Sequence, residues 1–189
     1  MSAAALLGLT VNLLYAVFNA FLGFRYHSYW FLSMSAWYLI VGLLKLFIFR
    51  RRKNEENADV LKNTGAGILF LAVVLSGIVC MGIAEQHNPV RELVVMIALA
   101  AYTFGYFGLA IYSARKAHKG NKDPEIARRS LALVCAIASM LSLERGMLGT
   151  FGDAGDHFTF VMEAASGLVA FLLLLLIGIS LLRRKKHAE

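Results

Sequence analysis

Three charged side chains in the last third of the chain, Glu144, Arg145 and Glu163, interrupt long apolar stretches. A charge in the hydrocarbon region of a membrane costs about 2.5 to 3.5 kcal/mol on insertion scales, so such residues usually face the protein interior, pair and mark function. Successive residues of a helix point about 100° apart, so Glu144 and Arg145 do not simply neutralise each other. We therefore expect Arg145 to find its partner, Glu163, on another helix.

Two neutral polar residues, Asn19 and Ser33, fall at a similar depth. With a rise of about 1.5 Å per residue, Asn19, Glu144 and Glu163 lie about 8 to 9 Å from the same face of the membrane. The predicted site is a ligand-binding pocket or a buried ion pair, and its members are Glu144, Arg145, Glu163, Asn19 and Ser33. An ion pair that only holds the helices in register is an equal alternative. Catalysis ranks last, because no nucleophile or metal motif accompanies the acids.

Lys45 is a fourth charged residue within an apolar stretch. It lies about one turn from the end of that stretch, and the flexible stem of a lysine lets its ammonium group reach the lipid headgroups. We expect Lys45 to extend to the membrane surface in this way and to have no functional role.

The histidines His27, His87 and His157 lie in three different connections between apolar stretches, near several acidic residues. Such a set is at most a weak candidate for a divalent metal site or for a response to acid pH. No spacing such as H-x-x-x-H, and no pair of carboxylates on one helix, supports a metal site. We predict no metal and no other cofactor.

The composition requires a lipid environment for these residues. The chain has 189 residues, 59% of them apolar, and a mean hydropathy of +0.65. A soluble domain of this size cannot bury that much apolar surface. Proline is scarce and glycine is common, at 16 residues, which suits long helices in close contact. Gly105, Gly108 and the segment 164–167 are the positions where we expect such contact.

Six apolar stretches are long enough to cross a hydrocarbon layer of about 30 Å, which takes about 20 helical residues. Their predicted bounds are 3–24, 29–49, 65–84, 93–114, 130–149 and 158–182. The predicted fold class is therefore all-α: a polytopic integral membrane protein with a six-helix bundle, forming one transmembrane domain over residues 1–189.

The placement of basic residues predicts the orientation. Fifteen of the 19 lysines and arginines lie in the segments 50–63, 115–129 and 183–186, whereas the connections on the other face hold only Arg25 and Arg91. Cytoplasmic loops hold such residues in excess. Both termini should then be cytoplasmic and the polar pocket should lie near the external face. We expect an integral protein of the plasma membrane, in a bacterium.

The leading functional hypothesis is a transport or solute-binding component for a small polar or anionic molecule, with Arg145 fixing an anionic group. In its six helices, cytoplasmic termini and outward pocket, the predicted architecture resembles the substrate-binding components of energy-coupling-factor vitamin transporters. That resemblance implies solute binding. The alternative is a sensor, immunity or assembly protein that meets a membrane or cytoplasmic protein partner through its basic loops. The lipid bilayer explains the positive charge, so no nucleic-acid partner is expected.

Overall fold

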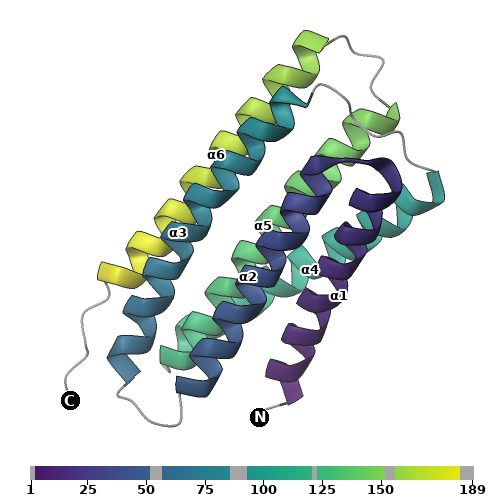
Figure 1. Ribbon diagram of the computed structural model, residues 1–189. Helices are drawn as coiled ribbons and strands as arrows, with labels where there is room; N and C mark the ends of the chain where they lie inside the picture. Colours follow the sequence, from purple (N-terminus) through teal and green to yellow (C-terminus); the bar gives the residue numbers. More distant parts are fainter. Residues whose placement is uncertain (1–2, 52–56, 86–92, 121–122, 152–155, 184–189) are drawn as a thin grey trace.

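The computed structural model describes residues 3–51, 57–85, 93–120, 123–151 and 156–183. These residues form six helices and no strand, so the predicted all-α class and the number of helices are confirmed (Figure 1). The helices are α1 (Ala3–Tyr26), α2 (Tyr29–Arg51), α3 (Asn57–Ala84), α4 (Leu93–Gly120), α5 (Asp123–Phe151) and α6 (Asp156–Arg183). Each predicted apolar stretch lies within one helix, and α3 and α5 extend furthest beyond it into polar sequence.

Four of the helices contain stretches that are long and apolar enough to cross a membrane. These stretches are Tyr29–Ile48, Val60–Ala84, Glu125–Thr150 and His157–Arg183. A shorter apolar stretch, Leu99–Tyr112, lies in α4. The helices therefore support a location in a membrane.

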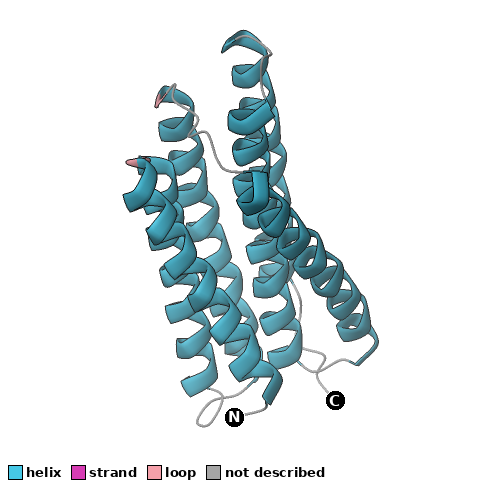
Figure 2. Cartoon of the chain, turned by 90° about the vertical axis from the view of Figure 1, so that its right-hand side faces the viewer, coloured by secondary structure: helices cyan, strands magenta, loops and turns pink. Residues whose placement is uncertain are grey.

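The bundle is built from three pairs of helices. α1 packs along α2, α4 along α5, and α3 along α6, while α2, α3 and α5 also contact one another and join the pairs (Figures 1 and 2). The first residue of α1 and the last residue of α6 lie at the same end of the bundle, which we call the terminal end. The other end, with the α1–α2 connection and the last turns of α3 and α5, is called the distal end.

α5 is the most enclosed of the four long apolar helices. Of its most apolar stretch, 67% is buried, against 28% for α6. It also carries the buried polar residues Ser139, Ser142 and Arg145. The side chains of these three residues therefore face protein.

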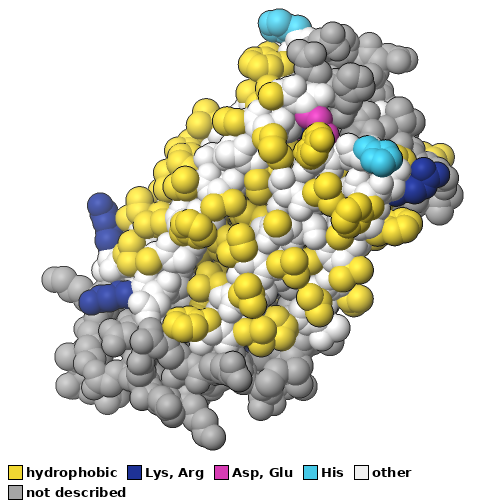
Figure 3. All heavy atoms as spheres, in the orientation of Figure 1, with side chains coloured by type: hydrophobic (Ala, Val, Ile, Leu, Met, Phe, Trp, Pro, Cys, Tyr) yellow, Lys and Arg dark blue, Asp and Glu magenta, His cyan; other side chains and the backbone are white. Residues whose placement is uncertain are grey.

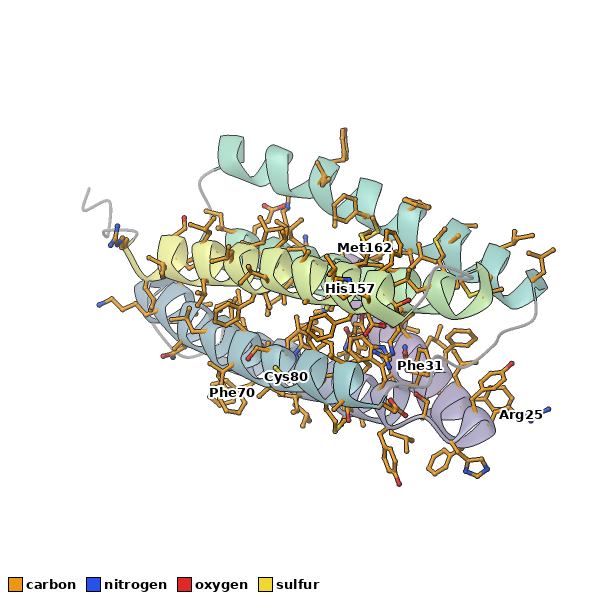
Figure 4. All side chains as sticks on the ribbon, turned by 90° about the horizontal axis from the view of Figure 1, so that it is seen from above. Arg25, Phe31, Phe70, Cys80, His157 and Met162 are labelled. Carbon is orange, nitrogen blue, oxygen red and sulfur yellow. The ribbon has the colours of Figure 1, made fainter. Side chains whose placement is uncertain are left out.

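The outer surface of the bundle is apolar. Hydrophobic side chains cover the middle of the face in Figure 3, and basic and histidine side chains lie toward its margins. Phe31 is fully buried and points into the bundle, whereas Phe70 and Arg25 point away from it (Figure 4). Exposed phenylalanine and leucine side chains in such numbers are stable against lipid tails rather than water.

In the part of the chain that the structure describes, helices approach each other closely at Gly65, Gly167 and Gly178, but not at Gly105 or Gly108. A Cβ added at Gly65 in α3 would lie 2.9 Å from the carbonyl oxygen of Gly178 in α6, so the close approach of these two helices requires glycine at position 65. Gly167 likewise meets Val79. The prediction for Gly105 and Gly108 was wrong, because an added Cβ would meet nothing within 4 Å among the described residues. These two glycines lie on an exposed face of α4.

The tight connection between α1 and α2 fixes where α2 begins. His27 adopts a left-handed backbone conformation, with φ of 50°, and the N–H of Ser28 donates a hydrogen bond to the carbonyl of Gly23 at 3.1 Å. This is the pattern of a Schellman motif, which ends a helix and reverses the chain. α2 begins at Tyr29, directly after this turn. The backbone N–H groups of its first turn, which have no partner within the helix, and the Trp30 side chain therefore lie at the distal end.

Candidate functional site

Arg145 is the centre of a buried ion cluster at the distal end of the bundle. It projects from the second-to-last turn of α5 and is only 3% exposed. Its Nη1 donates to Oε2 of Glu163 in α6 at 3.0 Å, and its Nη2 donates to the carbonyl oxygen of Gly82 in α3 at 2.7 Å. The structure thus brings together the arginine and the glutamate that the sequence predicted to pair, and a third helix joins them.

Glu85 links this cluster to the start of α2. Its carboxylate accepts hydrogen bonds from the backbone N–H groups of Tyr29 at 2.8 Å and Trp30 at 3.2 Å. The same carboxylate lies 3.7 Å from Nη2 of Arg145. A helix N-terminus carries unpaired N–H groups and a partial positive charge, both of which a carboxylate satisfies. Glu85 therefore ties the end of α3 to α2 and to α5.

Trp30 forms one wall of the cluster, and Gly82 makes room for it. The guanidinium carbon of Arg145 lies 4.7 Å from the centroid of the Trp30 ring, within the range of a cation–π interaction. A Cβ added at Gly82 would lie 2.7 Å from Cζ3 of Trp30 and 2.7 Å from Nη1 of Arg145. Only glycine lets the indole ring and the guanidinium group approach the backbone of α3 in this way.

A small cavity lies beside Arg145, between α2, α3, α5 and α6. It is lined by Trp30, Val79, Leu141, Glu144, Arg145, Glu163 and Ser166. Its volume of about 10 Å³ leaves room for roughly one water molecule or an ion of that size. Within the described part of the chain, the buried atoms Oε1 of Glu144, Nε1 of Trp30 and Nε of Arg145 have no hydrogen-bond partner. The residues that line the cavity therefore include one unsatisfied acceptor and two unsatisfied donors.

The charges around the cavity do not balance. Arg145 pairs with Glu163, and Glu85 has the N-terminus of α2 as well as Arg145. Glu144 lies near Ser166 and near the negative charge of Glu163, and no salt bridge joins it to a cation among the described residues. The described residues around the cavity and Glu85 thus carry three carboxylates and one guanidinium group, and only Glu163 and Glu85 pair with that group. An uncompensated charge in an enclosed site is costly, so a bound proton or cation would stabilise this arrangement.

Two residues of the predicted site lie elsewhere. Asn19 is buried on α1, where its Nδ2 donates to the carbonyl of Tyr15 at 2.8 Å, one turn earlier in the same helix. Ser33 is half-buried on α2 and does not line the cavity. Similar depth was the reason for grouping them with Arg145. α1 packs along α2, on the side of the bundle away from α6, so residues at one depth lie on different sides (Figure 1).

The histidines are not brought together into a site that the structure describes. His27 and His157 are both exposed, and His87 lies outside the described residues. No group of three or more histidine, cysteine, aspartate or glutamate side chains that could hold a metal ion occurs in the described ranges.

Lys45 belongs to a second polar cluster, which the sequence did not indicate. Its Nζ lies 3.4 Å from Oδ1 of Asn12 and 3.4 Å from Sγ of Cys135. Asn12 in turn donates to the backbone carbonyl of Tyr38 at 2.7 Å, so the cluster joins α1, α2 and α5. The prediction that Lys45 extends to the headgroups was wrong. A buried amide oxygen between two packed helices offers its ammonium group a nearer partner than the membrane surface.

A second cavity adjoins this cluster. It is lined by Val11, Asn12, Tyr15, Tyr38, Tyr106, Cys135 and Ser139, and it is also about 10 Å³ in volume. The hydroxyl of Tyr38 donates to the carbonyl oxygen of Cys135 at 3.3 Å. Cys135 is a free, buried thiol, whereas the other cysteine of the chain, Cys80, is free and exposed.

No protein-family model matches the chain, and no curated protein or solved structure shows significant similarity to it.

Proposed function

We propose that this protein is a small transport or solute-binding component of the plasma membrane, and that the cluster around Arg145 is its solute site. We also propose that the terminal end faces the cytoplasm, because the basic residues of the chain concentrate in the segments at that end. The Arg145 cluster then lies near the external face. A solute from outside would meet it first.

The surplus of carboxylates is the observation that carries this proposal, and it favours a cation over the small polar or anionic solute expected from the sequence. Arg145 is already engaged by Glu163, by Gly82 and, more distantly, by Glu85. An anionic solute would therefore add negative charge to a guanidinium group that already faces two carboxylates. Glu144 instead presents a buried carboxylate oxygen without a partner toward the cavity region. We therefore propose that the ligand is a small monovalent cation.

The size and chemistry of the cavity narrow the class of cation. Room for roughly one water molecule accommodates a cation of the size of ammonium without any helix movement. Ammonium and small protonated amines donate hydrogen bonds, which suits Glu144, Glu163 and the Ser166 hydroxyl. A larger amine would require α6 to move, and α6 is the least enclosed of the four long apolar helices.

The proposal is tested by the thermal stability of the purified protein in detergent with added salts. A ligand that binds only the folded state raises the melting temperature as its concentration rises. Ammonium and methylammonium chloride should raise it more than choline chloride at equal ionic strength, because the quaternary choline ion has no N–H donor. Glu144→Gln should abolish this difference. Equal curves for all three salts, or an unchanged response in the variant, would contradict a cation site.

A structural or interaction role is the second candidate, and the number of helices that Arg145 contacts favours it. One side chain joins α3, α5 and α6 through hydrogen bonds and α2 through the Trp30 ring. Such a cluster holds four helices in register without any ligand. In that case the ammonium, methylammonium and choline salts should have equal effects on the melting temperature. The basic segments of the terminal end would then bind anionic lipid or a protein partner.

A further inference from the structure

Buried polar residues form a continuous line along α5 between the two clusters. Cys135, Ser139, Ser142 and Arg145 follow one another at spacings of four, three and three residues, and all four are buried. Residues three or four apart are neighbours on the surface of a helix. The line extends over ten residues, or about 15 Å of helix. It therefore connects the Lys45 cluster to the Arg145 cluster.

Each end of this line has a cavity and a titratable group. Cys135 and Ser139 line the second cavity, and Lys45 lies 3.4 Å from Cys135. Arg145 lines the first cavity, together with Glu144. Both cavities have room for roughly one water molecule. Glu144 and Ser166 at the first cavity, and Asn12 and Ser139 at the second, carry groups that can hydrogen-bond such a water.

Ser142 lies at the middle of the line, between the two cavities. Its side chain is 1% exposed, and its hydroxyl has no hydrogen-bond partner among the described residues. A buried hydroxyl without a partner is costly, and native proteins usually satisfy it with protein groups or water. Ser142 is a surface neighbour both of Ser139, at the second cavity, and of Arg145, at the first. It can therefore relay hydrogen bonds between waters in the two cavities.

We propose that this line of residues conducts protons through the bundle between Glu144 and Lys45. A hydroxyl or water on the path forms a new O–H bond as it gives up another, so the proton advances with no oxidant, reductant or net change in bonding. The charged groups that line the first cavity with Glu144 are Arg145 and Glu163, and Glu85 lies on the far side of Arg145 as its second carboxylate, while Lys45 faces the neutral groups of Asn12 and Cys135.

The proton path is distinct from the proposed solute site and does not depend on the identity of the solute. A proton path would supply the energy source for a transporter, because protons moving down their gradient can drive another solute. It would also operate alone, as a conductance, in a protein that binds no amine. The two proposals are therefore tested separately. The salt dependence of the melting temperature tests the solute site, and the proton flux into vesicles tests the proton path.

The test is proton uptake by vesicles that contain the purified full-length protein and a pH-sensitive dye. A potassium gradient with valinomycin imposes a membrane potential, negative inside, that draws protons inward. Vesicles with protein should acidify faster than protein-free vesicles. Ser142→Ala should remove most of this difference, since it deletes the relay hydroxyl and leaves both charged clusters in place. Glu144→Gln and Lys45→Met should remove it as well.

Controls separate the path from a general leak or a folding defect. Ser180→Ala changes an exposed serine of α6 and should leave the flux unchanged. Ser142→Thr keeps the hydroxyl and should retain a measurable flux. Every variant is compared at equal helix content and equal reconstituted amount. Protein vesicles that acidify no faster than empty ones overturn the proposal. So does a Ser142→Ala variant that conducts as well as the unmodified protein.

Discussion

Nη1 of Arg145 and Oε2 of Glu163 lie 3.0 Å apart, across the contact between α5 and α6. Both side chains are almost fully enclosed, with 3% and 10% of their surfaces exposed. Breaking a buried ion pair by removing one partner is far more costly than removing both, because the remaining charge has no compensation. Comparing the two single variants with the double variant therefore measures how much this ion pair contributes to the free energy of unfolding.

Arg145→Gln and Glu163→Gln are each expected to lower the free energy of unfolding, by about 3 to 5 kcal/mol as for other buried pairs. The double variant should lose less than the sum of the two single changes. Thermal unfolding in one detergent, followed by circular dichroism, measures all four proteins. Losses that simply add would show that the two side chains do not interact in the folded protein.

Gly82→Ala tests the contact between Trp30 and the backbone of α3. The added methyl group would overlap the indole ring and the Arg145 guanidinium group, so we expect a loss of about 1 to 3 kcal/mol. Gly77→Ala is the matched control in the same helix, because its added Cβ would meet nothing within 4 Å among the described residues. Melting temperatures of the two variants should differ clearly. Equal values would mean that Trp30 does not pack against Gly82.

Glu85 is expected to stabilise the start of α2 through its two backbone hydrogen bonds. Glu85→Gln keeps one acceptor oxygen but loses the charge, and Glu85→Ala loses both acceptors. Stability should therefore fall in that order, by about 1 kcal/mol or more for the alanine variant. Glu125→Gln serves as the control, since Glu125 pairs with Arg128 and Arg129 near the surface, where a salt bridge contributes little. A larger loss at Glu125 would argue against the capping role.

The sequence predicted the helices well because the apolar stretches are continuous and the membrane limits their length. It also brought Arg145 and Glu163 together, since two opposite charges at one depth in lipid have strong reason to pair. Asn19 and Ser33 were misplaced for a physical reason. Depth along the membrane normal follows from the rise of a helix, but the side of the bundle on which a residue lies depends on helix packing, which the pattern does not contain.

Two residues of the Arg145 cluster that the sequence missed, Glu85 and Gly82, have roles that depend on backbone groups. Glu85 binds the N–H groups at the start of α2, and Gly82 offers its carbonyl oxygen and its lack of a side chain to Arg145 and Trp30. Only the position of Glu85, directly after an apolar stretch, could have suggested that it lies at the depth of Arg145. Lys45 was misassigned because its partner, Asn12, is on another helix.

The two cysteines should differ sharply in their reactivity toward a small maleimide. Cys80 is exposed on α3, and Cys135 is buried between α1, α2 and α5. In mild detergent we expect one adduct per folded molecule, on Cys80, and two after unfolding in dodecyl sulfate. Intact-protein mass spectrometry counts the adducts, and Cys80→Ser should leave the folded protein unmodified. Rapid labelling of Cys135 in the folded protein would contradict its enclosed position.

The orientation of the bundle can be measured with cysteines introduced at its two ends, in a Cys80→Ser background. Arg25 is exposed near the end of α1, at the distal end, and Lys62 is exposed near the start of α3, at the terminal end. If the terminal end is cytoplasmic, a membrane-impermeant maleimide labels Arg25→Cys in intact cells and labels Lys62→Cys only after the cells are opened. The reverse pattern would place the Arg145 cluster near the cytoplasmic face. Solutes would then reach it from inside, and Glu144 would be the cytoplasmic end of the proposed proton path.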